Sequence, residues 1–593
     1  MRLRSVLPVP VIVSVISMMI SSYSAGQSNI TQVDSTIAVS SGADDEAEPG
    51  DWWEDWRFGM LIHFDPFSIN TLHQPGETNP EINTHSMKDR NQLLSQFNPK
   101  LFNADEWVRL AQEAGVQLIV PSVRNNDGFC LFDSPYTDSD IASTPIKRDI
   151  LQEMIEACRK RGMPVGWYYV LPDESRSVGE KQQGDDNEIV LHEVDELFTK
   201  YGPVDIIWFE SNGKNERTDK QHRPLYNHIK SVSPKTVIRF LDNHRTDDHN
   251  DRVHHIRLYH DSIPQRREAA QPWLTLTTLN DSPGRNQADI HWKSPVEIIH
   301  SLITTVSRGG NDVLDVTVAG DGSKPTPMVD ELKRVGAWLK VNGDSVYGCK
   351  PSPFHYLQWG RATIDRENPS RMYFHIFDWP THDGMLRLPG VMNRVEKAWF
   401  LKRGPKGKLR TLADRGGVMV RVGRKPIDSL CTVLVVDVAG APDVADVPIF
   451  PQAHTGVVIL EAGDAYLHGS EMCLEEGGGA NDIRFTTNPE EWAQWDFEIR
   501  KGGEFNLRIN YECSGNTDDS RFLINIYKKN DDTIIATTTQ EMDPSEGEEA
   551  FPLTDPGVVH INDPGRYIFR ASVKGMPHDA VLKLRSIRLE PKS

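Results

Sequence analysis

The sequence predicts a multidomain protein in which a (β/α)₈-type barrel is followed by two all-β sandwich domains. The chain has 593 residues, which is too long for a single hydrophobic core. Strand and helix patterns alternate from residue 50 to residue 348, as is typical of parallel βα units. Helical periodicity then disappears, and short alternating strands separated by turns fill the remaining sequence.

The N-terminal part of the sequence is predicted to lie outside the folded domains. Residues 1–26 combine the basic start "MRLR", an apolar stretch and small residues, which indicates a secretory signal peptide. A membrane anchor is the alternative, because the apolar run is near the shortest length that spans a bilayer. Residues 27–49 are small, polar and acidic, which favours a disordered leader. We therefore expect a secreted or periplasmic protein without membrane contact after signal cleavage.

The first βα repeat sets the pattern of the barrel. The stretch "FGMLIHFDPF" is an apolar strand that leads into a polar loop. The stretch "NADEWVRLAQEAG" is an amphipathic helix for which Asn103 is a suitable N-cap and Gly115 a suitable end. The strand "VQLIVPSV" follows directly.

Later repeats continue this alternation through the predicted catalytic domain, residues 50–348. Helical stretches such as "RDILQEMIEACRKRG" and "NEIVLHEVDELFTKYG" each precede an apolar strand, "MPVGWYYVL" and "PVDIIWFE". The late helix "SPVEIIHSLITTVSRGG" leads into "DVLDVTV". The length suits a (β/α)₈ barrel, which usually has about 250 residues. An open doubly wound sheet is the alternative, although no GxGxxG loop follows the first strand.

Two β-rich segments follow the barrel. Residues 349–445 contain short strands such as "RMYFHIFDWP" and "CTVLVVDV", which predict a small sandwich. Residues 446–456 are expected to form a linker because they lie in a Pro- and Gly-rich stretch. Residues 457–593 predict a second sandwich, which resembles appended carbohydrate-binding modules. Trp492 and Trp495 are its candidate stacking aromatics, although either ring can belong to the core.

Composition restricts the partners and cofactors. The sequence has 85 acidic and 65 Lys or Arg residues, for a formal net charge of −20. An acidic protein is poorly suited to phosphate backbones, so we expect no nucleic-acid partner. The six cysteines are widely spaced without a CxxC pair, so we expect no zinc site. We expect no metal and no cofactor of any kind. Disulfide pairing and the oligomeric state are left open.

Polar and aromatic residues gather at the predicted strand ends. His63 follows one strand, Asn125 and Asn126 follow another, and Trp208 and Glu210 end a third. In parallel barrels the strand ends meet at one face, where active sites lie. Amides and imidazole bind hydroxyl groups, and an indole ring packs against the apolar face of a sugar. The combination favours a neutral polyhydroxylated ligand.

An ordered set of motifs resembles the α-L-fucosidase family of glycoside hydrolases. The set includes "WRFGMLIHFDPFS", "FNADEWVRLAQEAGVQLIVPSVRNNDGF", "LFTKYGPVDIIWFE" and "SRGGNDVLDV", and the similarity covers roughly residues 50–445. The resemblance implies an exported enzyme with a barrel-like catalytic domain. It also implies hydrolysis of terminal α-L-fucose with retention, so that the expected partner is a glycan.

The resemblance assigns roles to the residues at the strand ends. The family's nucleophilic aspartate falls on Glu210, its stacking tryptophan on Trp208 and its strand-1 histidine on His63. The two histidines that hold sugar hydroxyls in the family fall on Asn125 and Asn126, because "KHHDGF" is here "RNNDGF". Glutamate in place of aspartate lengthens the nucleophile by one methylene, and a misplacement of about 1 Å can cost roughly 100-fold in rate.

The acid/base residue is the weakest assignment. The family's glutamate is expected within "YHDSIPQRREAAQPWLTL", where Glu268 and Asp261 are the nearest acids, and Glu268 is the candidate. Asp312 and Asp315 also stand where the family has neutral residues; they can act in the site or pair with a base such as Arg308. These departures leave two alternatives to an active hydrolase: a catalytically silent carbohydrate-binding protein, and an adhesion protein that acts through its last sandwich.

Overall fold

The structure is a computed structural model that describes most of the chain after residue 55. The predicted signal peptide, the predicted leader and Glu268 lie outside the described residues. The described residues are 56–64, 66, 87–172, 186–211, 219–242, 255–260, 263, 272–280, 291–354, 357, 359–381, 383–414, 416–445, 447–469, 472–477, 480–514, 521–529, 533–541, 553–574 and 581–592.

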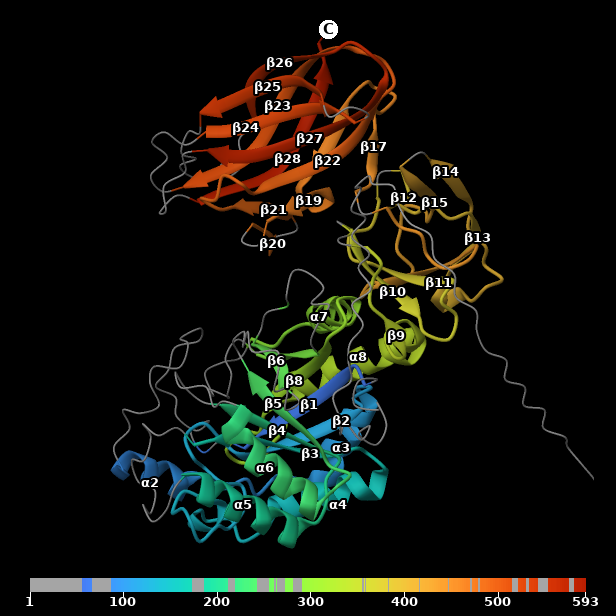
Figure 1. Ribbon diagram of the computed structural model, residues 1–593. Helices are drawn as coiled ribbons and strands as arrows, with labels where there is room; N and C mark the ends of the chain where they lie inside the picture. The colour runs from blue at the N-terminus through green and yellow to red at the C-terminus, as the bar shows by residue number, and fades with distance from the viewer. Residues whose placement is uncertain are drawn as a thin grey trace, which may run out of the picture. The chain divides into compact units, whose positions relative to one another are not determined.

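Eight parallel strands form a closed barrel (Figure 1). Strand β8 pairs with β1 and thereby closes the sheet, with Leu61 opposite Asp315. Closure confirms the predicted barrel and excludes the open doubly wound sheet. The strands are β1 Phe58–His63, β2 Leu118–Arg124, β3 Gly166–Leu171, β4 Ile206–Ser211, β5 Val237–Asp242, β6 His255–His260, β7 Trp273–Thr278 and β8 Asn311–Thr317.

Helices alternate with these strands, and their ends follow local sequence signals. The Asn103 side chain accepts a hydrogen bond from Glu106 N at 3.2 Å, so it caps α3 as predicted. Gly115 and Gly162 follow α3 and α4 with φ of 86° and 64°, where a side chain would be strained. The helices are α2 Met87–Gln96, α3 Ala104–Glu113, α4 Ile150–Arg161, α5 Asp186–Tyr201, α6 Asp219–Val232, α7 Pro295–Ser307 and α8 Thr326–Asn342.

Alternation along β4 determines which side chains enter the barrel. Ile206 and Trp208 belong to the apolar cluster inside the barrel, together with inward residues of the other strands. Ile207 and Phe209 belong instead to the cluster between the strands and the surrounding helices. Because successive strand residues point to opposite faces, Glu210 points into the barrel like Ile206 and Trp208. The buried strand therefore ends with its carboxylate at the inner rim.

The chain after the barrel forms two β-sandwiches, which confirms the predicted fold class. The first consists of the sheets β13-β16-β11-β10-β9 and β12-β15-β14 around an apolar core. Its strands are β9 Cys349–Lys350, β10 Gly360–Asp365, β11 Arg371–Ile376, β12 Met385–Pro389, β13 Val395–Phe400, β14 Thr411–Asp414, β15 Gly417–Arg421 and β16 Thr432–Val438. Short 3₁₀ turns, η3 to η6, connect some elements at Ile141–Ser143, Gly343–Ser345, Leu401–Arg403 and Ala462–Asp464.

The second sandwich consists of two six-stranded sheets around a separate core. Strand β17 lies in the predicted linker and pairs with β22, so part of that linker belongs to the last sheet. The strands are β17 Ile449–Pro451, β18 Val458–Glu461, β19 Tyr466–His468, β20 Cys473–Gly477, β21 Ala480–Phe485, β22 Trp492–Ile499, β23 Gly503–Ser514, β24 Arg521–Lys528, β25 Thr533–Glu541, β26 Leu553–Ile561, β27 Gly565–Lys574 and β28 Val581–Pro591.

Cysteines, helix hydropathy and surface charge add three further features. The six cysteines all lie in the described residues, and none of them forms a disulfide bond there. Within the described ranges, no helix is both long and apolar enough to cross a bilayer.

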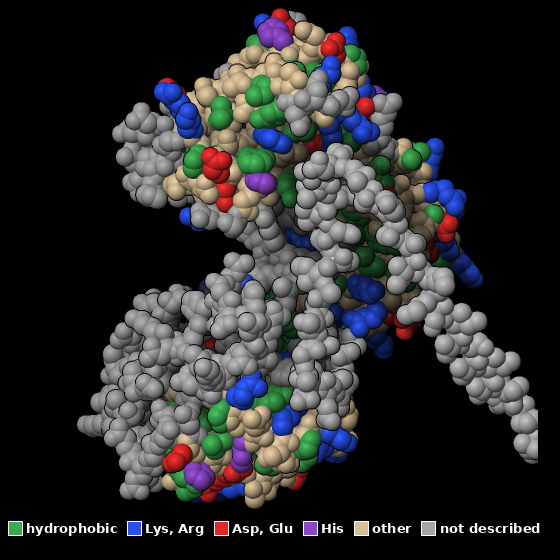
Figure 2. Space-filling view, in the orientation of Figure 1, with side chains coloured by type: hydrophobic (Ala, Val, Ile, Leu, Met, Phe, Trp, Pro, Cys, Tyr) green, Lys and Arg blue, Asp and Glu red, His purple; other side chains and the backbone are tan. Residues whose placement is uncertain are grey.

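On the face drawn in Figure 2, basic and acidic side chains are interspersed among the coloured residues around the barrel. That face therefore presents no continuous basic surface in its described part.

Two buried histidines predict that acid weakens the fold. Burial lowers the pKa of His375 from 6.5 to about 3 and the pKa of His300 to about 4. In the unfolded chain both titrate near 6.5, so below that pH the unfolded state binds more protons. Their contribution to stability is therefore present above pH 6.5 and is lost as the pH falls through 6.5 toward the lowered pKa values.

The His375→Gln variant isolates this effect. Asp464, whose pKa burial raises from 3.8 to about 7, acts in the opposite direction over the same range. The pH dependence of the wild-type melting temperature is therefore the sum of opposing contributions from these groups. The difference in melting temperature between variant and wild type isolates the contribution of His375. We expect the melting temperature of wild type, relative to that of His375→Gln, to decrease as the pH falls from 7 to 4. The exposed His454→Gln variant should retain the wild-type slope, and an equal slope in both variants would refute the assignment.

Candidate active site

Glu210 is a buried carboxylate at the end of β4 with partners at both oxygens. Its side chain is 7% exposed. The Tyr168 hydroxyl donates a hydrogen bond to Glu210 Oε2. His260 Nε2 lies 3.6 Å from Glu210 Oε1. A hydrogen bond fixes the orientation of a carboxylate, so this arrangement can hold a nucleophile or a base in place.

Tyr168 is suited to remain a donor. Burial raises the pKa of its hydroxyl well above 10, because a phenolate is costly inside the barrel. The nearby carboxylates of Glu210 and Asp315 raise this pKa further by repelling a second negative charge. Tyr168 therefore keeps its proton over the whole working range of pH and donates a hydrogen bond to Glu210.

His63 is held by a carboxylate from the neighbouring strand. Its Nδ1 lies 2.9 Å from Asp315 Oδ1, and its ring centre lies 5.6 Å from that of Tyr168. Asp315 Oδ1 has no hydrogen-bond partner among the described residues, so the two side chains make a close polar contact without the geometry of a hydrogen bond. The pairing of Asp315 with His63 places Asp315 in the site.

These contacts form one continuous chain at the carboxyl ends of the barrel strands. Each member contacts the next, and together they come from strands β6, β4, β3, β1 and β8. Sequence reasoning predicted Glu210 and His63 as site residues and left a site role open for Asp315, whereas it gave no site role to Tyr168 or His260. The chain is His260, Glu210, Tyr168, His63 and Asp315.

Trp208 lies one inward position before Glu210 on β4. It is completely buried, and its ring centre is 5.9 Å from that of Trp56. Its indole N–H has no hydrogen-bond partner among the described residues. In this structure Trp208 is therefore a core residue inside the barrel, and no face of its ring is exposed. Its role as a stacking surface for a sugar stays a prediction.

Asn125 and Asn126 lie in the turn after β2. Asn125 Nδ2 donates to Phe64 O at 2.8 Å, and Ser122 Oγ donates to Asn125 Oδ1. Asn125 thus ties the loop after β2 to the end of β1. Asn126 is exposed. Each amide retains hydrogen-bonding capacity, and their role as sugar contacts stays a prediction.

A β-bulge turns Arg124 away from the barrel interior. The pairing of β2 with β3 shifts between Ser122 and Arg124, which places Arg124 beside the outward Tyr169. Arg124 Nε lies 3.6 Å from Glu193 Oε2 on α5, and the Tyr169 hydroxyl donates to the same carboxylate. Arg124 also donates to Val170 O at 2.8 Å. Arg124 therefore supports the rim of the barrel and stays out of the sugar site.

Asp312 and Asp127 have structural partners. Asp312 is completely buried and accepts a hydrogen bond from Thr277 Oγ1 at 2.9 Å. Asp127 accepts from Phe129 N at 3.1 Å and so stabilises its turn. No group of metal-ligating side chains occurs among the described residues.

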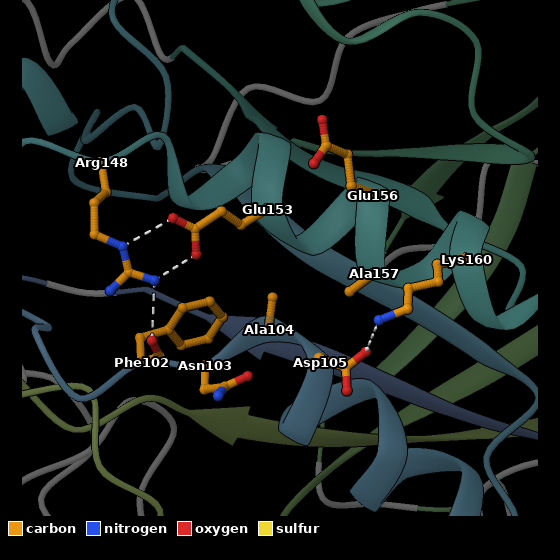
Figure 3. Close-up of a pocket in the computed structure, with 9 residues that line it drawn as sticks. All are labelled: Phe102, Asn103, Ala104, Asp105, Arg148, Glu153, Glu156, Ala157 and Lys160. Carbon is orange, nitrogen blue, oxygen red and sulfur yellow. Dashed lines mark hydrogen bonds and ion pairs between the residues drawn. The ribbon is translucent and has the colours of Figure 1, made fainter.

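A separate pocket lies outside the barrel, between the start of α3 and α4 (Figure 3). It has a volume of about 370 Å³. Four of its five charged side chains form ion pairs, Arg148 with Glu153 and Lys160 with Asp105 at 3.2 Å. The fifth, Glu156, accepts a hydrogen bond from Gln152 Nε2 at 2.7 Å. None of the predicted site residues lines it. The pocket is therefore a surface hollow with satisfied charges.

Comparison with known proteins agrees with this geometry. Residues 25–344 match the family model described as alpha-L-fucosidase. The chain is 23% identical over 392 residues to the alpha-L-fucosidase of Dictyostelium discoideum, across 60% of this chain and 84% of that protein. It is 26% identical over 375 residues to human tissue alpha-L-fucosidase, across 57% of this chain and 77% of that protein.

A solved structure shows the same fold over most of the length. The alpha-L-fucosidase from Vibrio sp. strain EJY3 superposes with a TM-score of 0.68 at 21% identity, covering 91% of this chain and 97% of that one. The family model spans more than half of the present chain, and the barrel places an inward carboxylate at a strand end. The chain therefore belongs to the α-L-fucosidase family of glycoside hydrolases.

Proposed function

We propose that the protein is an exported retaining glycoside hydrolase that cleaves terminal α-L-fucose, or a related sugar, from glycans. The observation that carries the proposal is Glu210: an acid at the family's nucleophile position, buried at the inner rim of the barrel and hydrogen-bonded by Tyr168. Family membership supports the reaction class, and the contacts of Glu210 support its choice as the nucleophile.

In the proposed reaction Glu210 acts twice at the anomeric carbon. A Glu210 oxygen attacks that carbon, a new C–O bond forms, and the bond to the leaving oxygen breaks as an acid protonates it. Water then attacks the same carbon, loses its proton to the conjugate base and releases Glu210. Two inversions give net retention. Glu268 remains the proposed acid/base residue, and the mechanism requires its carboxyl group about 5–5.5 Å from Glu210.

Tyr168 and His63 have supporting roles in this proposal. Tyr168 holds Glu210 Oε2, and Oε1, which lies 3.6 Å from His260 Nε2, is the oxygen proposed to attack. His63, whose Nδ1 lies beside Asp315, is proposed to contact a sugar hydroxyl through Nε2. Buried groups that are already oriented cost no reorganisation during the reaction.

The Tyr168→Phe variant tests the contact with the nucleophile. It removes one hydrogen bond to a charged group, which is worth about 1.5–3 kcal/mol. We expect kcat to fall roughly 10- to 150-fold, with a small change in KM. Tyr169→Phe is the matched control, because the neighbouring hydroxyl bonds Glu193 on the outer side of the strand. Equal losses in the two variants would contradict the assigned contact.

Hydrolysis of aryl glycosides tests the proposed activity. The purified chain should release the aryl group from an α-L-fucoside, and the initial product should keep the α configuration by NMR. Other aryl glycosides form the comparison panel. Calorimetry with L-fucose distinguishes the silent carbohydrate-binding protein: stable binding without turnover of any glycoside would favour that alternative and overturn the hydrolase.

Export is the remaining part of the proposal. Its support is the predicted signal sequence, residues 1–26. Expression in the native host should yield a mature protein that begins after residue 26 and lies outside the cytoplasm. Mass spectrometry of the mature N-terminus checks this, and a cytoplasmic protein that retains residues 1–26 would contradict it.

A further inference from the structure

One sheet of the second sandwich has an outer face rich in polar and planar side chains. In this sheet β19, β22, β27, β24 and β25 lie side by side. Trp495, Phe569 and Ile524 point to the core. The residues that alternate with them therefore point the other way. On this outer face Tyr466, Gln494, Arg570, Asn525 and Thr537 are direct partners across the strands.

Planar side chains form a stacked ladder across this face. The rings of His468 and Trp492 stack at 3.7 Å between centres. Arg570 lies over Trp492 at 5.2 Å and over Tyr527 at 4.8 Å, measured from its guanidinium carbon to each ring centre. Arg570 Nε also donates to Gln494 Oε1 at 3.0 Å. The guanidinium is thus fixed in position before any ligand arrives.

The stacked side chains leave little room for a neutral sugar on the ring of Trp492. His468 covers one side of the indole ring, and Arg570, from the strand on the opposite side of β22, lies over it as well. Trp495, the other candidate, is completely buried in the core. Burial excludes the stacking role predicted from sequence for Trp495, and His468 and Arg570 already contact the Trp492 ring, so the most available binding chemistry is that of Arg570.

Arg570 keeps donors for a negatively charged group. Among the described residues its Nη atoms have no carboxylate partner. Asn525, directly opposite on β24, accepts from Thr537 Oγ1 at 2.9 Å and so retains its Nδ2 donors. Two Nη atoms and one Nδ2 match the three terminal oxygens of a sulfate ester, whereas a carboxylate has only two. Arginine binds such oxyanions through its fork of donors.

Further basic residues extend this charge along the same face. Lys574 lies four residues beyond Arg570 on β27, about 13 Å along the strand. It stands directly opposite Arg521, and like charges in that position are unfavourable without an anion. The only carboxylate paired with Arg521 in the described chain is the exposed Glu541, at 3.5 Å. The acids that β22 adds to this face, Asp496 and Glu498, are both buried, and Asp496 is paired with Lys529.

We propose that this outer face binds a sulfated polysaccharide, with a sulfate group on Arg570 and Asn525 and the chain extending toward Lys574. The proposed binding face contains no residue of the barrel. A test of glycan binding at this face is therefore separate from a test of the proposed hydrolase activity. It gives the second sandwich the role of anchoring the protein to anionic glycans.

Three dextrans with one backbone test the ligand. The full-length protein is titrated with dextran, carboxymethyl-dextran and dextran sulfate at the same salt concentration, with double-stranded DNA as a further polyanion. Dextran sulfate should bind and dextran should not. Equal binding of carboxymethyl-dextran would overturn the assignment to sulfate. Equal binding of DNA or of dextran would overturn the site altogether.

Variants test the residues. Arg570→Gln should weaken dextran sulfate binding roughly 10-fold or more, as expected for a charged hydrogen bond. Lys574→Gln removes an exposed charge outside the ladder and should weaken binding about 3-fold. This variant tests the face without the risk that loss of Arg570 disturbs the sheet. Arg424→Gln is the matched control: an exposed arginine of the first sandwich, outside this face. Wild-type affinity in both Arg570→Gln and Lys574→Gln, or an equal loss in Arg424→Gln, would refute the proposal.

Discussion

The Glu210→Gln variant is expected to lose about 10³-fold or more in kcat on an aryl α-L-fucoside. The amide has nearly the shape of the carboxylate but cannot attack the anomeric carbon, so the first chemical step is lost. Tyr168 can still donate to the amide oxygen, and the fold should remain intact. Steady-state kinetics and a melting curve measure the two effects separately.

Azide gives this prediction a stricter form. Glu210→Ala leaves space beside the anomeric carbon, where azide can attack and release the aryl group. The expected product is the fucosyl azide of inverted configuration, and its rate should rise with azide concentration. The exposed Glu188→Gln variant is the control and should behave as wild type. Full activity in Glu210→Gln would remove Glu210 from the mechanism.

The Glu193→Ala variant is expected to destabilise the barrel by about 3–5 kcal/mol. Glu193 is 2% exposed and is the carboxylate beside Arg124 and the Tyr169 hydroxyl. Its removal leaves a buried guanidinium without that partner. For a domain of this size the loss corresponds to a decrease in melting temperature of roughly 5–8 °C.

Glu188 on the same helix provides the control for this stability prediction. It is exposed, so Glu188→Ala should change the melting temperature by a degree or less. Differential scanning calorimetry on both variants measures the difference. If Glu193→Ala and Glu188→Ala have the same melting temperature, the contact of Glu193 with Arg124 contributes nothing measurable to stability.

The fold could be predicted because its signals are local. The cap at Asn103 and the glycines after α3 and α4 lie within a few residues of the ends that they define. The position of Glu210 after the apolar run "DIIWF" predicted a strand end, and the structure ends β4 there with Trp208 and Glu210 both inside the barrel. Patterns of period 2 and period 3.6 are readable within one element.

The rest of the site depends on contacts between distant strands. His63 meets Asp315 only because β8 closes onto β1, and no local pattern specifies that closure. Two tyrosines are adjacent in "GWYYVL", and strand pairing decides that Tyr168 faces Glu210 while Tyr169 faces α5. The bulge that turns Arg124 outward is likewise set by the pairing of β2 with β3.

Packing between sheets sets a similar limit in the second sandwich. Trp492 and Trp495 are separated by three positions, so alternation predicts opposite faces. Which face meets the core depends on the partner sheet, and the structure buries Trp495. The ladder that covers Trp492 requires residues from β19 and β27, far from it in the sequence.

Covalent labelling of the wild-type protein tests the role of Glu210 most directly. A 2-deoxy-2-fluoro-fucosyl fluoride slows release of the covalent intermediate, because the fluorine destabilises the positively charged transition state. After labelling and proteolysis, mass spectrometry should find the fluorofucosyl group on the peptide that contains Glu210, attached to that side chain. Labelling of a different residue, or rapid hydrolysis of the reagent by the Glu210→Gln protein, would contradict the proposed mechanism.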